Sequence, residues 1–143
     1  MSDHSRPEGV SDALVEATGT LSEAYEYLIR ARGHVYSAHQ LIGRVDILAG
    51  EAADQLEAAG AVEQAERLRR EVVGRNVLTG RWTFQMVEEF DATYYRVFED
   101  AERRVRDELL GGKRHVYESE MKDDRRTDGE QGHERRPGDA PGA

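Results

Sequence analysis

The chain has 143 residues, of which 34% are charged and 38% hydrophobic, and its formal net charge is -9. No cluster of lysine and arginine could neutralise several neighbouring phosphates, so nucleic acid is not expected as a direct partner. The sequence has no cysteine, which excludes disulfides, thiolate metal sites and a cysteine nucleophile. No segment approaches the roughly 20 apolar residues of a membrane span. Because the N-terminal residues also lack a signal-peptide pattern, we expect a cytoplasmic protein without a membrane partner.

The first predicted elements are a disordered arm and a long helix. Residues 1–18 are rich in Ser, Asp, Pro and Gly and predict disorder. Residues 20–59 then show a seven-residue apolar repeat, which is typical of a coiled-coil helix. Its first position is Leu21, Leu28, Val35, Ile42, Ala49 and Leu56, and its second is Ala24, Ala31, Ala38, Val45, Ala52 and Ala59. The small side chains at the second position require a bulky partner helix.

Two further helices and an interruption follow Gly60, which is well placed to end the first helix. The apolar spacing predicts a helix over 61–74 and another over 82–110. Between them, 74–80 contains two glycines, an asparagine and β-branched residues, which favour a turn. The last helix carries a second apolar seam of larger residues, namely Val87, Phe90, Tyr94, Val97 and Ala101. This seam is the bulky partner that the alanines require.

The expected architecture is therefore all-α. We expect a long antiparallel hairpin within a helical domain over 19–112, with position 78 opposite position 42. Such a hairpin leaves apolar flanks uncovered, so we expect a homodimeric four-helix bundle. The flanks are Tyr27, Leu41 and Leu48 on one side and Tyr95 and Phe98 on another.

The tail, residues 113–143, is charged and nearly free of apolar side chains, and its composition predicts disorder. A short helix over 114–123 would place Val116, Tyr117 and Met121 on one side. That side could dock on the bundle or on another protein.

Three groups of side chains are candidates for a specific role. The first group is the pair His34 and His39. These residues are five positions apart on one helix, so their rings point in different directions and cannot bind the same ion. No metal site is therefore predicted. The second is a structural ion-pair network in which Arg32, His39 and Asp46 face Asp91 of the antiparallel helix. Its alternative is a set of solvated charges that contribute little to stability.

The third group surrounds the helix break. It offers hydrogen-bond donors, two guanidinium groups and an aromatic plane, which suit a carboxylate or a phosphate. Its members are His39, Arg75, Asn76, Arg81, Trp82, Gln85 and Glu88. The break matches no phosphate-loop pattern, and the alternative is a kink covered by tryptophan.

Two segments carry a resemblance. The run Gly80–Asp91 (GRWTFQMVEEFD) and the segment His115–Met121 (HVYESEM) resemble parts of small all-helical proteins of high-GC actinobacteria. The resemblance spans most of residues 20–135, and the 18 arginines against two lysines suit a GC-rich genome. It implies a helical fold, but that family has no assigned activity and transfers no functional residue.

The sequence thus favours a non-catalytic helical scaffold or protein-protein interaction module, without a cofactor. No catalytic residue is assigned, because the chain has no Gly-x-Ser-x-Gly motif and no Ser, His and Asp arrangement. The alternative function is a bundle that binds a small molecule, an anion or a metal near the 74–82 break.

Overall fold

The computed structural model describes residues 3–143 and confirms the all-α class. Its described residues contain no β-strand, only an isolated bridge between Leu78 and Arg81. No described helix has the length and the apolar content to cross a membrane. In chain order the elements are α1 (Asp12–Ala58), α2 (Val62–Glu71), α3 (Thr83–Phe90), the π-helical segment η1 (Asp91–Tyr95), α4 (Arg96–Leu110), α5 (Val116–Arg125) and the short 3-10 helix η2 (Pro137–Asp139).

The chain divides into two units, which differ from the single domain expected over 19–112. The central unit is Tyr27–Val97, and the terminal unit combines the residues up to Glu26 with those from Phe98 onward. Helices α1 and α4 each contribute to both units. The units are described separately below.

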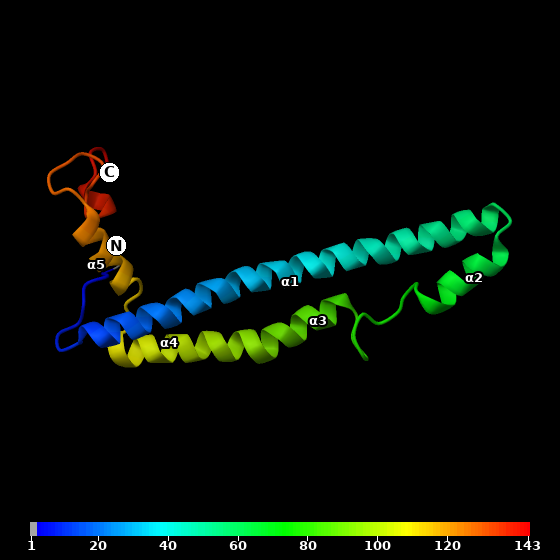
Figure 1. Cartoon of the computed structure of the whole chain (residues 1–143), viewed down its shortest axis with the longest axis horizontal. Coiled ribbons are helices and arrows are strands. Elements are labelled where there is room, and N and C mark those ends of the chain that lie inside the picture. Colours follow the sequence, from blue (N-terminus) through cyan, green and yellow to red (C-terminus); the bar gives the residue numbers. More distant parts are fainter. Residues whose placement is uncertain (1–2) are drawn as a thin grey trace. The chain divides into compact units, whose positions relative to one another are not determined.

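In the central unit, α2 folds back along α1 after a turn at Gly60, as the green segment of Figure 1 shows. Gly60 has a φ of 88°, a left-handed conformation that glycine adopts without steric cost. The side chain of Asp46 accepts a hydrogen bond from the backbone of Gly74, and Arg32 pairs with Asp91. Both contacts lie within three residues of the expected register, so this unit contains the predicted antiparallel pairing.

Helix α1 begins earlier than the sequence predicts. It starts at Asp12, where the Ser11 hydroxyl accepts a hydrogen bond from the Leu14 N–H and so caps the first turn. Val15 and Thr18 are buried. The disorder expected for 1–18 is therefore wrong for residues from Asp12 onward, and residues 1–2 of that arm lie outside the described part.

In the terminal unit, the first part of the tail forms helix α5 and packs against α1 and α4. Val15 of α1, Leu110 of α4 and Val116 of α5 form a small buried core, with Val10 packed against it. Arg6 also joins the N-terminal residues to α5, because its guanidinium donates to both carboxylate oxygens of Glu120 at 2.8 Å. This segment of the tail is therefore helical and packed, which agrees with the short helix that the sequence allowed and not with the disorder expected for the rest of the tail. Its helix occupies Val116–Arg125 where the sequence predicted 114–123.

Helix α1 buries a different side from the one that its apolar repeat predicts. The first heptad position is at least partly buried throughout, but most of the second position is exposed. A position one residue further along takes its place on the buried side: Tyr25, Arg32, His39, Asp46 and Ala53. The intrachain partners therefore cover three polar residues of α1 together with the first heptad position, whereas most of the second position stays exposed.

The π-helical segment changes the buried side of the last helix in the same way. A π-helix inserts one extra residue into a turn, which rotates every later side chain by about one position. Tyr95, the last residue of η1, is partly buried, and Phe98 and Glu102 continue its side of the helix and are also partly or fully buried. Tyr94, Val97 and Ala101 of the predicted seam are exposed. The expected seam is therefore correct up to Phe90 and wrong beyond it. The expectation that Tyr95 and Phe98 form an exposed flank is also wrong.

Candidate functional site

The clearest polar arrangement in the central unit surrounds Arg32, whose guanidinium forms two parallel bonds with Asp91. Nε lies 2.7 Å from Oδ1 and Nη2 lies 2.9 Å from Oδ2. The guanidinium also lies 4.9 Å from the ring centre of Tyr36 and 5.1 Å from that of Tyr95. Two aromatic faces and a bidentate carboxylate thus hold this cation in a single orientation.

The hydrogen bonds from Arg32 and its positive charge hold the pKa of Asp91 below its usual range. Both partners are about one third exposed. Asp91 is the first residue of η1, so the ion pair lies where the helix changes phase. This arrangement fixes the register of two helices, and it leaves no unpaired charge to attract a ligand.

The other two members of the expected network have different surroundings. Asp46 Oδ1 accepts a hydrogen bond from the Gly74 N–H at 2.7 Å, beyond the C-terminal end of α2. His39 Nδ1 is buried without a hydrogen-bond partner among the described residues, and its ring lies edge-on to that of Tyr36. The structure therefore brings together Arg32 and Asp91, whereas neither His39 nor Asp46 forms a hydrogen bond or an ion pair with that pair among the described residues. His39 approaches the pair only through the ring of Tyr36.

The two arginines at the helix break bond to acceptors within the break and in the helices on either side of it. Arg81 pairs with Glu89 and also donates to the carbonyl oxygen of Thr79. Arg75 donates to the carbonyl oxygen of Glu71. Each guanidinium already has acceptors, which lowers the attraction of this segment for an anion.

Gln85 and Trp82 have structural roles at the start of α3. Gln85 Oε1 accepts a hydrogen bond from the Trp82 N–H at 2.8 Å and so caps this helix. The Trp82 ring packs edge-on against Phe84. Asn76 and Glu88 are exposed. An open depression here is lined by residues 75–80, and His39 does not line it.

Two of the three tail residues expected to bind a partner contact other residues of this chain instead. Val116 is 2% exposed and belongs to the core of the terminal unit. Tyr117 packs over Gly19 of α1, where an added Cβ would lie 3.1 Å from the tyrosine Cβ. Met121 is exposed. The side of α5 that carries Val116 is therefore occupied by α1 and α4.

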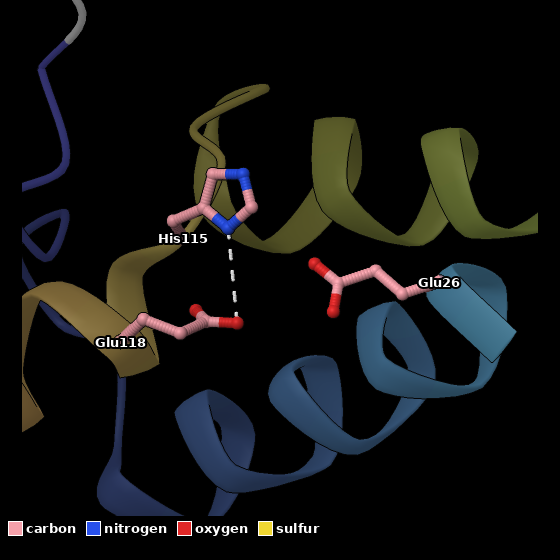
Figure 2. A group of neighbouring side chains, drawn as sticks. All are labelled: Glu26, His115 and Glu118. Atoms are coloured by element: carbon pink, nitrogen blue, oxygen red, sulfur yellow. Dashed lines mark ion pairs between the residues drawn. The ribbon is translucent and has the colours of Figure 1, made fainter.

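Sequence reasoning missed one group of potential metal ligands in the terminal unit. Glu26 of α1 converges with His115 and Glu118 at the beginning of α5 (Figure 2). Their ligand atoms all lie within 4.8 Å of one another, and His115 Nδ1 is 3.7 Å from Glu118 Oε1. The only sequence signal was the three-residue spacing of His115 and Glu118, because the approach of Glu26 depends on how α5 packs.

Comparison with known proteins gives no match: no protein family, curated protein or solved structure is similar to this chain at a significant level.

Proposed function

We propose that this chain is a non-catalytic helical scaffold that assembles with a second copy of itself through α1. The observation that supports this most strongly is an apolar face on α1 within the central unit, here called the α1 face. It consists of Tyr27, Leu41, Val45 and Leu48, which are 60%, 67%, 58% and 46% exposed. Large apolar side chains with this much exposure, gathered on one side of a helix, are typical of an interaction surface.

The positions of these residues favour a helix as the occupant. Tyr27, Leu41 and Leu48 follow the seven-residue period of α1, and Val45 lies four residues after Leu41 and three before Leu48. They therefore lie in one stripe along the helix, with His34 at the period position between Tyr27 and Leu41, next to the side that α2, α3 and η1 occupy. A helix in a four-helix bundle buries two neighbouring sides, one against each adjacent helix.

A second copy of the chain fits this surface by symmetry. In a two-fold dimer the same stripe on each copy meets itself, and apolar residues of both chains are covered at once. Val97 of α4, which is 67% exposed, supplies further uncovered apolar area in the central unit. We place the dimer in the cytoplasm, without nucleic acid as a partner.

The test is sedimentation equilibrium of the full chain at micromolar concentrations. We expect the wild type to have twice the chain mass and the Leu41→Glu variant to have the mass of one chain. A buried glutamate in each copy would lack a partner and would be strongly disfavoured in the interface.

The matched control for this test is Leu78→Glu. Leu78 is similarly exposed but lies on the loop at the helix break and is not part of the α1 face. This variant should stay dimeric. A monomeric wild type, or equal dissociation of the two variants, would contradict the proposal.

The alternative of ligand binding at the 74–82 break has less support. Arg75 and Arg81 already bond to acceptors within the chain, and the depression beside them is open. An absence of any melting shift with phosphate or carboxylate ligands would agree with this ranking.

A further inference from the structure

We infer that Glu26, His115 and Glu118 form a binding site for a divalent transition-metal ion, with Zn²⁺ as the representative ion. The site joins α1 to α5 in the terminal unit. The site shares no residue with the α1 face, and metal binding there does not require dimer formation.

The donor set carries this inference. One imidazole nitrogen and two carboxylate oxygens are common protein ligands of Zn²⁺, whereas Mg²⁺ and Ca²⁺ prefer oxygen ligands alone. Three protein ligands leave at least one coordination position for water. A set of this composition is therefore selective by chemistry for the transition ion.

The geometry requires only small adjustments. Two ligands of a tetrahedral zinc lie about 3.3 Å apart when each bond is about 2.0 Å long. His115 Nδ1 and Glu118 Oε1 are 3.7 Å apart, and all the ligand atoms lie within 4.8 Å of one another. Glu26 is exposed, and its carboxylate points from α1 toward the other two residues (Figure 2). Rotation of its flexible side chain can close the remaining gap.

The charge balance also favours a cation. Within residues 3–143, neither Glu26 nor Glu118 has a lysine or arginine within ion-pair distance, and the histidine is the only partner of Glu118. Most other contacts that hold the terminal unit pair an acid with a base, such as Glu120 with Arg6 and Asp3 with Lys113. Two carboxylates that face each other without a positive charge repel, and a divalent ion would neutralise both.

A second imidazole lies beside the group. The His4 ring is 6.1 Å from that of His115 in an edge-on arrangement, and His4 Nδ1 lies 2.6 Å from the carbonyl oxygen of Arg114. His4 is therefore held by the backbone next to the site and is not one of the three ligands. A bound metal ion would link the start of α5 to α1 through its shared ligands.

The first test is calorimetric titration of ZnCl2 into the full chain. We expect one ion per chain and an affinity at least about tenfold weaker in the Glu26→Gln and His115→Gly variants. Glycine is chosen because His115 has a φ of 56° and a ψ of 31°, a left-handed conformation that glycine adopts readily. The backbone at the start of α5 is thus kept while the imidazole is removed.

The control is His133→Ala, which removes another tail histidine and should leave the affinity unchanged. A second readout is amide hydrogen exchange, since Zn²⁺ should slow exchange in α5 of the wild type but not of Glu26→Gln. No zinc binding by the wild type would overturn the inference. Equal affinity in the wild type, Glu26→Gln and His115→Gly would overturn it as well.

Discussion

At the scale of single residues, the bidentate pair of Arg32 and Asp91 joins α1 to η1 in the central unit. We expect Asp91→Asn to lower the melting temperature at pH 7 by about 4 °C, because the neutral amide loses the charge of a bidentate pair. The pKa of Asp91 is depressed, so its contribution is complete above the usual carboxyl pKa and is lost as the pH falls. The difference between wild type and variant should therefore narrow below about pH 4.

Thermal unfolding followed by circular dichroism between pH 7 and pH 2 measures this effect. The control is Asp100→Asn, because Asp100 forms an exposed pair with Arg103 that should contribute little. A melting difference for Asp91→Asn that stays constant down to pH 2 would show that its cause is not the carboxylate charge.

Substitution of alanine for Gly33 and for Gly19, both in α1, tests whether Tyr117 packs on this helix. An added Cβ at Gly33 meets no atom within 4 Å, so Gly33→Ala should stabilise the helix by about 1 kcal/mol. At Gly19 the same Cβ would lie 3.1 Å from Tyr117 Cβ, which is fixed to the backbone of α5. Gly19→Ala should therefore displace α5 and raise its amide exchange rates. Equal stabilisation by the two alanines, without faster exchange in α5, would show that Tyr117 does not pack on α1.

At the scale of elements, η1 determines which side chains of the last helix are buried. Deleting one residue from a π-helical turn restores the regular α-helix and keeps the later residues in their positions. We expect deletion of Ala92, which is exposed, to preserve the helical content and the melting temperature, with Tyr95 and Phe98 still on the buried side.

The control for this prediction is deletion of Arg104, an exposed residue of the regular helix α4. That deletion rotates the following residues by about 100° and removes Leu110 from its buried position, so it should destabilise the terminal unit strongly. The account of η1 would be wrong if the Ala92 deletion were as destabilising as the Arg104 deletion. Circular dichroism melting curves of the two proteins give the comparison.

The sequence predicted the elements of this fold better than their contacts. Apolar spacing indicated the three main helices, and the glycines at 60 and 74–80 marked their ends, because these signals are local. The register of the hairpin, with position 78 opposite position 42, could be predicted because the first predicted helix is about as long as the two later ones together. The phase of the last helix could not be predicted, since an inserted π-turn leaves no distinct mark in the apolar pattern.

The same distinction holds for the site residues. The pairing of Arg32 with Asp91 could be proposed from heptad positions, because the seam of the last helix keeps its expected phase up to Phe90 and Asp91 follows directly. The approach of Glu26 to His115 could not, because it depends on how α5 packs against Val15 and Leu110. The early start of α1 was missed because the disorder-prone composition of the first residues outweighed the cap at Ser11.

At the scale of the whole molecule, the central claim is that a second copy covers the α1 face. The intrachain partners of α1 occupy the side that carries Arg32, His39 and Asp46, while apolar side chains on the adjacent side stay exposed. The proposed second copy would bury this apolar stripe and leave the polar contacts unchanged.

The most direct measurement is hydroxyl-radical footprinting of the full chain at increasing protein concentration, which reports the solvent exposure of each side chain. We predict that Leu41 and Leu48 become several-fold less reactive as dimers form, whereas Leu78 keeps the same reactivity at every concentration. If Leu41 and Leu48 stay as reactive at high concentration as at low concentration, the α1 face is not an interface between two copies.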